Sequence, residues 1–262
     1  MKVRLLMRYK LFEVGPFTIY SYGFMIALGF ILCTILAEKR SKKLGLEGEK
    51  IVSLAFWCIG GGLIGAKVLY YITDIKNIIE NPKILLDVAN GFVVYGGIIG
   101  GVIGGYLFAR KNKMDFWAYF DLAMPSVALA QGFGRIGCFL AGCCYGRETD
   151  GSWGIVFHDS PFAPNGVHLV PTQLISSAGD FLICFILCMY ARKSKKKGSV
   201  GALWLILYSV GRFAIEFLRN DPRGNVGILS TSQFIAIFMF VAGIAIFAMA
   251  NRGKETAASK VN

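Results

Sequence analysis

Residues 229–250 read LSTSQFIAIFMFVAGIAIFAMA and contain no charged side chain. A transmembrane helix needs roughly 20 consecutive apolar residues to cross the hydrocarbon core of a bilayer. Further apolar segments of this kind precede it, at about 17–37, 51–71, 92–109, 116–142, 174–191 and 199–218. The sequence therefore predicts an all-α integral membrane protein, a bundle of about seven transmembrane helices.

The composition agrees with a membrane protein and argues against a soluble one. Hydrophobic residues make up 55% of the 262 residues and charged residues only 17%, whereas soluble domains carry about 25% charged residues. Because the apolar segments take up most of the chain, we expect residues 1–262 to form a single polytopic membrane domain. The net charge of +12 would suggest a nucleic-acid partner in a soluble protein. Here the basic residues lie in short links between apolar segments, so we expect no nucleic acid to bind.

The basic links also predict the orientation in the membrane. Lysine and arginine are frequent in the link 38–50, after residue 109, after residue 191 and in the C-terminal tail, and sparse in 72–91, 143–173 and 219–228. Because basic links stay on the cytoplasmic side, the C-terminus is expected in the cytoplasm and the N-terminus outside. The basic residues near the N-terminus (Lys2, Arg4, Arg8 and Lys10) disagree with this orientation, and the three internal basic links carry more weight.

The link 143–173 is the longest, and it lies on the outer side in this topology. It contains Trp153, both histidines of the chain (His158 and His168) and turn-forming residues at 161 and 164–166. This composition predicts a small extracytoplasmic cap at the membrane surface. The two histidines are interpreted as surface or lid residues rather than catalysts.

Glycines gather in the segments 51–71 and 92–109, where Gly96, Gly100 and Gly104 recur every four residues. This spacing lines one helix face with small residues and lets helix backbones touch. A phosphate-binding loop would follow a soluble strand, which this sequence does not offer. We therefore interpret the glycine pattern as a sign of tight helix packing.

A few charged residues stand inside the apolar segments, where each costs roughly 2.5–3.5 kcal/mol and usually has a function. Arg212, Glu216 and Arg219 are spaced i, i+4, i+7 and therefore share one helix face. In the predicted topology, several polar side chains lie at a similar depth in the outer half of the membrane: those of Tyr22, Lys67, Tyr95, Arg135, Arg212 and Glu216. Several cations in the outer leaflet suit a phospholipid phosphate, which arginine binds in bidentate fashion. The alternatives are a structural Arg212–Glu216 ion pair, and snorkelling of Arg135 and Lys67 to the headgroups.

The most distinctive segment is GRIGCFLAGCCYGR, residues 134–147. It resembles the signature Gly-Arg-x-Gly-Asn-Phe-x-Asn-x-Glu-x-x-Gly of the bacterial prolipoprotein diacylglyceryl transferases. Other motifs of that family are matched in order along nearly the whole chain: Gly15-Pro16-Phe17 with Tyr22-Gly23, Gly65-Ala66-Lys67 with Tyr70-Tyr71, Tyr95-Gly96-Gly97, Pro171-Thr172-Gln173-Leu174, and Arg212-Phe213-x-x-Glu216-Phe217-x-Arg219.

The resemblance implies an enzyme that moves the diacylglyceryl group of phosphatidylglycerol to the lipobox cysteine thiol of a lipoprotein precursor and releases glycerol phosphate. It implies catalytic roles for Arg135 and Arg212, which would stabilise the phosphate, and for Glu216, which would orient Arg212. The implied substrate-binding residues are Tyr22, Lys67, Cys138, Gly146 and Arg219. The implied partners are phosphatidylglycerol, the signal peptide of the precursor and membrane lipids, the implied place is the bacterial inner cell membrane, and no metal or cofactor is implied.

The chain departs from the family pattern where the proton acceptor is expected. Cys138 and Ala141 stand where the family has asparagine, Cys143 where it has glutamate, Tyr95 where it has the histidine proposed as the base, and Lys67 where it has arginine. Tyr95 would need a strongly lowered pKa to act as the base. Cys143 is the other catalytic candidate, as a thiolate base or a transient covalent nucleophile near Arg135.

Alternatives remain open for the cysteines and for the function. Cys138, Cys143 and Cys144 are also compatible with a disulfide or with simple packing. A metal site is disfavoured because Cys-x4-Cys-Cys with two remote histidines lacks ordinary zinc spacing. The alternative functions are a related phospholipid transferase with another acceptor and a cysteine-based mechanism, and a lipid-binding or transport membrane protein. The latter is disfavoured because no internal repeat is visible.

Overall fold

The computed structural model describes residues 9–252 apart from 16, 88, 89, 152, 195 and 223. The basic residues of the N-terminal end (Lys2, Arg4 and Arg8), the motif residue Pro16 and the tail after Arg252 lie outside the described residues.

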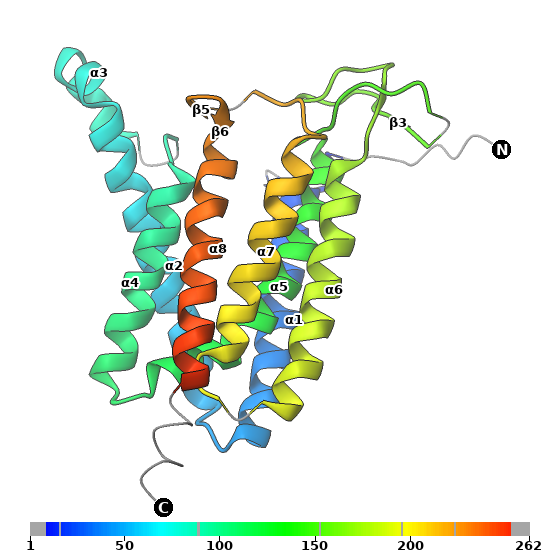
Figure 1. Cartoon of the computed structure of the whole chain (residues 1–262). Coiled ribbons are helices and arrows are strands. Elements are labelled where there is room, and N and C mark those ends of the chain that lie inside the picture. The colour runs from blue at the N-terminus through cyan, green and yellow to red at the C-terminus, as the bar shows by residue number, and fades with distance from the viewer. Residues whose placement is uncertain are drawn as a thin grey trace, which may run out of the picture. The chain divides into compact units, whose positions relative to one another are not determined.

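A long helix occupies most of each predicted apolar segment (Figure 1): α1 Ser21–Leu44, α2 Glu49–Thr73, α4 Val94–Lys111, α5 Phe116–Ala141, α6 Thr172–Lys193, α7 Ser199–Glu216 and α8 Thr231–Arg252. Among the described residues, α1, α2, α6, α7 and α8 are long and apolar enough to cross a membrane. The helical membrane class is therefore confirmed. The number of seven crossings stays a prediction, because α4 and α5 are not among these five helices.

Shorter elements precede or connect the long helices. They are α3 Ile75–Glu80, the 3-10 helix η1 Pro82–Leu86 and three antiparallel pairs, β1 Lys10–Val14 with β2 Phe17–Tyr20, β3 Ile155–Val156 with β4 His168–Leu169, and β5 Asn225–Val226 with β6 Leu229–Ser230. Residues 17–20 were expected to be helical. They form β2 instead, because they pair with β1, and the helix begins only at Ser21.

The chain divides into two compact units, Met1–Leu36 with Phe120–Asn262, and Ala37–Tyr119. A single membrane domain over residues 1–262 stays a prediction.

In the unit Ala37–Tyr119, α2 and α4 pack backbone to backbone at their glycines. A Cβ atom added at Gly100 would lie 2.2 Å from the carbonyl oxygen of Gly61, and one added at Gly96 would lie 2.2 Å from that of Gly65. Only glycine fits at such distances. The interpretation of the glycine pattern as tight helix packing is confirmed.

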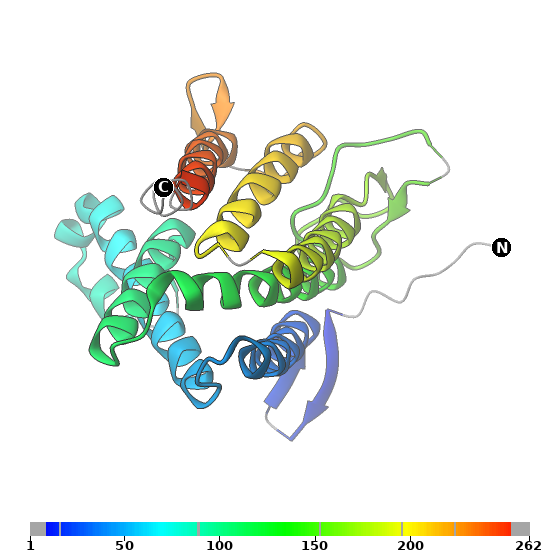
Figure 2. The same ribbon diagram turned by 60° about the horizontal axis from the view of Figure 1, so that its bottom comes forward.

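In the other unit, α5 packs against α6 and α7 on one side and against α1 on the other (Figure 2). The ring of Phe181 in α6 fills the space above Gly132 of α5, and the ring of Phe120 in α5 fills the space above Gly201 of α7. The hydroxyl of Ser177 in α6 also donates to the carbonyl oxygen of Gly132 over 2.9 Å. These contacts fix α5, α6 and α7 as the frame of one cavity.

The predicted cap is a folded segment beyond the ends of α5 and α6 (Figure 1). The strands β3 and β4 pair within it, and Phe157, Ala163 and Leu169 form a small core with Phe139 of α5. His158 and His168 are exposed. The cap is thus held to the helices by its own apolar core.

Candidate active site

A cavity of about 310 Å³ lies between α5, α6 and α7. Its polar lining consists of Arg135 from α5, Ser176 and Asp180 from α6, and Tyr208 and Arg212 from α7, and the remaining lining residues are apolar or glycine. The two arginines selected from the sequence thus line the same cavity. Two guanidinium groups in a partly apolar cavity can bind a phosphate group with bidentate hydrogen bonds.

Arg212 is held from two helices. Its Nη1 atom lies 2.7 Å from Oε2 of Glu216, one turn further along α7, and Nη2 donates to the hydroxyl of Ser232 in α8 over 2.6 Å. The contact with Glu216 has ion-pair distance without the alignment of a hydrogen bond. Glu216 is buried and Arg212 is largely covered, so this arrangement fixes the guanidinium before any substrate arrives.

Asp180 and Tyr208 were missed in the sequence. The carboxyl group of Asp180 is buried in α6 and lies close enough to Arg135 and Arg212 to interact with both electrostatically. Asp180 could have been found by the rule that selected the arginines, because it is an ionisable residue within an apolar segment. A tyrosine in an apolar segment gives no such signal.

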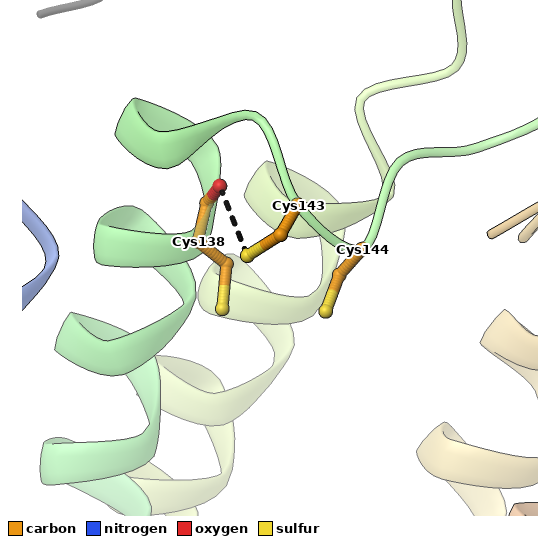
Figure 3. A group of neighbouring side chains, drawn as sticks. All are labelled: Cys138, Cys143 and Cys144. Carbon is orange, nitrogen blue, oxygen red and sulfur yellow. Dashed lines mark hydrogen bonds between the residues drawn. The ribbon is translucent and has the colours of Figure 1, made fainter. Parts of the chain in front are cut away.

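Three thiols meet where α5 ends. Cys138 belongs to the last turns of α5, Cys143 and Cys144 to the loop that follows, and their three sulfur atoms lie within 4.8 Å of one another (Figure 3). The thiol of Cys143 also donates to the carbonyl oxygen of Cys138 over 3.7 Å (Figure 3). All seven cysteines of the chain are free thiols in this structure.

The loop is held in a conformation that makes the thiols converge. The φ angle of Cys144 is +60°, a left-handed conformation that a side chain rarely adopts and that its surroundings must enforce. The hydroxyl of Thr172 donates to the carbonyl oxygen of Cys144 over 2.8 Å, and the amide of Gln173 donates to that of Cys143 over 2.8 Å. The motif Pro171-Thr172-Gln173 therefore has a structural role, since it fixes the cysteine loop to the start of α6.

The thiols of the loop differ in acidity. Hydrogen bonds with the thiols of Cys138 and Cys144, together with burial, raise the pKa of Cys143. Hydrogen bonds with the thiols of Cys138 and Cys143, and the nearby guanidiniums of Arg219 and Arg135, lower the pKa of Cys144. The two arginines thus favour a negative charge on Cys144, and a catalytic role of Cys143 stays a prediction.

Arg219 and Gly146 are joined to each other beside this loop. They face each other in an antiparallel bridge, and the Arg219 side chain donates to both carboxylate oxygens of Asp221, over 2.9 and 2.7 Å. A Cβ atom at Gly146 would lie 2.5 Å from the carbonyl oxygen of Val170. Close packing therefore accounts for the glycine, and the substrate-binding roles of both residues stay predictions.

Tyr22 belongs to the same unit. A Cβ atom at Gly137 of α5 would lie 3.2 Å from Cδ2 of Tyr22 in α1, so the glycine allows the two helices to approach here. Tyr22 is close enough to the three thiols and to Arg135 to interact with them electrostatically. This position is compatible with the predicted role in substrate binding.

Lys67 and Tyr95 lie in the unit Ala37–Tyr119, on α2 and near the start of α4. The ammonium group of Lys67 donates to the carbonyl oxygens of Asp87 and Asn90, over 2.5 Å each. It also lies 5.2 to 5.3 Å from the ring centres of three aromatic residues, Tyr70, Tyr71 and Phe92. These contacts connect α2 to the segment before α4, and the predicted roles of Lys67 and Tyr95 stay untested.

Comparison with known proteins identifies the family of this chain. A family model described as "Prolipoprotein diacylglyceryl transferase" matches residues 9–249. A phosphatidylglycerol–prolipoprotein diacylglyceryl transferase of Clostridium tetani is 56% identical over 241 residues, 92% of this chain and 97% of the relative. The second enzyme of this name in Clostridium perfringens is 49% identical over 92% of this chain and 94% of its own length. A relative of the same name in Finegoldia magna is 34% identical over 89% of this chain and 92% of its own length. The chain belongs to the prolipoprotein diacylglyceryl transferase family.

Proposed function

We propose that this protein is a membrane transferase that moves the diacylglyceryl group of phosphatidylglycerol to the lipobox cysteine thiol of a lipoprotein precursor and releases glycerol phosphate. The observation that carries the proposal is the cavity lined by Arg135 and by the fixed guanidinium of Arg212, in a chain 56% identical to an enzyme named for this reaction.

The two arginines suit the change of charge in this reaction. The phosphate of phosphatidylglycerol is a diester with one negative charge, and the released glycerol phosphate is a monoester with about −1.5 to −2 at neutral pH. The phosphate therefore gains negative charge as the bond to the diacylglyceryl carbon breaks. Donors that are fixed in advance stabilise such a transition state most strongly, and Glu216 and Ser232 fix Arg212 in this way.

The acceptor side of the reaction needs a thiolate, because the thiolate is the nucleophile. A carbon–sulfur bond forms at the diacylglyceryl carbon while the carbon–oxygen bond to the phosphate breaks, and the thiol proton has to leave. The signal peptide of the precursor would bring its cysteine close to Arg135, which lines the cavity and interacts electrostatically with the thiols of Cys138 and Cys144. The thiols of Cys138 and Cys143 lie in the chain positions where the family signature has asparagine and glutamate, and Cys144 follows directly.

The topology is proposed to have seven crossings, with α4 and α5 added to the five helices identified by length and composition. The last turns of α1, α4, α6 and α8 are all basic, with Lys42 and Lys43, Arg110 and Lys111, Arg192 and Lys193, and Arg252. With seven crossings these four ends share one side, which the basic residues make the cytoplasmic side. The N-terminus and the cap would then lie outside the bacterial inner membrane.

The test is a transfer assay with purified protein. Labelled phosphatidylglycerol and a synthetic lipobox peptide are incubated with the protein in lipid nanodiscs, with the Clostridium tetani relative as the positive control. Lipidated peptide and free glycerol phosphate are expected in equal amounts. No lipidated peptide with this chain, under conditions in which the relative works, would refute the proposal.

A further inference from the structure

The thiol cluster formed by Cys138, Cys143 and Cys144 has a geometry that the spacing of the cysteines does not reveal. We propose that these three residues bind one Zn²⁺ ion, and that the fourth coordination position of the ion takes the thiol of the acceptor peptide. The inference rests on the proposed function, since it assigns the activation of the acceptor thiol to this site.

The distances suit zinc. A zinc ion bound by thiolates has Zn–S bonds of about 2.3 Å, which place tetrahedral ligands roughly 3.8 Å apart. The three sulfur atoms lie within 4.8 Å of one another without an ion, so closing on a metal requires movements of about an ångström at most. Structural zinc sites use four protein ligands, whereas catalytic sites use three and keep one position open. The described residues of this cluster offer three ligands and no histidine or carboxylate.

The loop holds the ligands in place before a metal binds. Thr172 and Gln173 bind the backbone carbonyls of Cys144 and Cys143, and they belong to a helix that is itself bonded to α5 through Ser177. Groups of this kind, which orient the metal ligands without touching the metal, commonly change metal affinity by about 10- to 100-fold. The unusual backbone of Cys144 is thus accounted for as the conformation that brings the third sulfur atom to the other two.

The charged residues around the three thiols also suit a zinc ion. Three thiolates and one Zn²⁺ carry a net charge of −1, which a neighbouring cation stabilises. The guanidinium groups of Arg135 and Arg219 both interact electrostatically with Cys144. Arg135 also lines the phosphate cavity, so this residue connects the cluster to the place where the lipid phosphate would bind.

Zinc would promote the deprotonation of the acceptor thiol, the step for which this chain lacks the usual base of the family. A thiol that coordinates zinc loses its proton, so the acceptor cysteine would be a thiolate when it meets the lipid. Its sulfur forms the bond to the diacylglyceryl carbon, and the electron pair of the broken carbon–oxygen bond stays on the phosphate. The released proton goes to solvent or to the glycerol phosphate. The oxidation state of zinc does not change, and the thioether leaves because it is a weaker ligand than the thiolate.

The first experiment measures metal binding without any lipid. Purified protein in detergent is reduced, treated with a chelator and titrated with Co²⁺, whose thiolate complexes have charge-transfer absorption, and then with Zn²⁺, which displaces cobalt. One ion per chain is expected. Replacing Cys138, Cys143 or Cys144 with serine should weaken binding by more than about tenfold, whereas Cys33→Ser, a matched change in α1, should not. The absence of charge-transfer absorption in the wild-type protein would overturn the metal site.

The second experiment separates this inference from the proposed function. The transfer assay is run with chelator-treated protein, with and without added Zn²⁺, and with the Clostridium tetani relative beside it. Loss of transfer after chelation and its recovery with zinc supports the role of the ion. Full transfer by the metal-free protein overturns that role while the proposed function stands.

Two other experimental outcomes would refute the proposed function or the zinc site. Cobalt binding by a protein that transfers nothing would refute the proposed function and the role of the fourth position, and would leave only a metal site. A disulfide between two of the three cysteines, found by mass spectrometry in active protein purified without reductant, would overturn the proposal.

Discussion

Replacing Glu216 with glutamine removes the negative charge beside Arg212 and keeps the shape of the side chain. The two side chains are exposed by only 14% and 3% for Arg212 and Glu216, so the arginine charge would remain buried. Breaking a buried ion pair in this way costs about 3–5 kcal/mol. We expect the lower end, about 3 kcal/mol, because the Ser232 hydroxyl still accepts a hydrogen bond from Arg212.

A second variant separates stability from catalysis. In the double variant Arg212→Met and Glu216→Leu, both charges are replaced with apolar side chains, a change that is often neutral or stabilising for a buried pair. Its melting temperature should therefore return close to that of the wild type, while transfer falls at least about 100-fold because the phosphate loses a fixed donor. Glu38→Gln is the control, since Glu38 pairs with Lys42 at 56% and 72% exposure and such pairs contribute about 0–1 kcal/mol.

The assays are thermal unfolding of the detergent-solubilised protein and transfer from labelled phosphatidylglycerol. A loss of about 3 kcal/mol corresponds to a fall in melting temperature of roughly 6–12 °C for a chain of this size. An unchanged melting temperature in Glu216→Gln would show that the pair does not hold the buried charge. A double variant that transfers lipid at the wild-type rate would refute the assignment of Arg212 to the phosphate.

Other changes test the cavity and the packing of the helices. Arg135→Lys should lower the transfer rate by about 100-fold or more with an unchanged melting temperature, since lysine keeps the charge and loses the bidentate donor; a normal rate would contradict this. Gly100→Ala should destabilise the protein by about 1–3 kcal/mol in thermal unfolding, because its Cβ atom would lie 2.2 Å from the Gly61 carbonyl oxygen. Gly97→Ala is the matched control in the same helix, with 3.5 Å to the nearest atom, and equal losses in both would contradict the packing. Asp121→Asn should cost about 1–3 kcal/mol by the same measurement, because the Asp121 carboxylate accepts from the backbone N–H groups of Gly198 and Gly201 over 2.7 and 2.8 Å; wild-type stability would contradict this.

The helices could be predicted because a bilayer imposes its thickness on the composition of whole segments. The segment 229–250 predicts α8 within two residues at each end, since charged and turn-forming residues surround it. Residues 17–20 were wrongly assigned to a helix because Phe-Thr-Ile-Tyr is apolar enough to continue the segment. Their pairing with β1 depends on a turn at Gly15, which a count of apolar residues does not detect.

The site was only partly predictable, and the reason differs from residue to residue. Arg135 and Arg212 were selected because an ionisable group in an apolar segment is expensive, and Asp180 meets the same criterion but was overlooked. The convergence of the three thiols could not be derived from their spacing. It depends on the left-handed backbone of Cys144 and on hydrogen bonds from Thr172 and Gln173, residues about thirty positions away in the chain.

The position of Cys138 relative to Arg135 bears on how both halves of the reaction fit one lipid. The two residues are three positions apart on α5, and side chains at this spacing lie on one helix face with about 5–6 Å between their Cβ atoms. In a displacement at carbon the entering sulfur and the leaving oxygen lie on opposite sides of the reacting atom, and productive complexes hold the reacting atoms about 3–3.5 Å apart. The acceptor sulfur at the thiol cluster and the leaving oxygen near Arg135 would therefore lie about as far apart as two side chains one turn apart on α5.

The changes from the family signature affect the half of the site that faces the thiol, while the arginines that face the phosphate are kept. Zinc at the cluster thus explains why cysteine can replace both the asparagine and the glutamate of the signature without any change in the phosphate-binding residues.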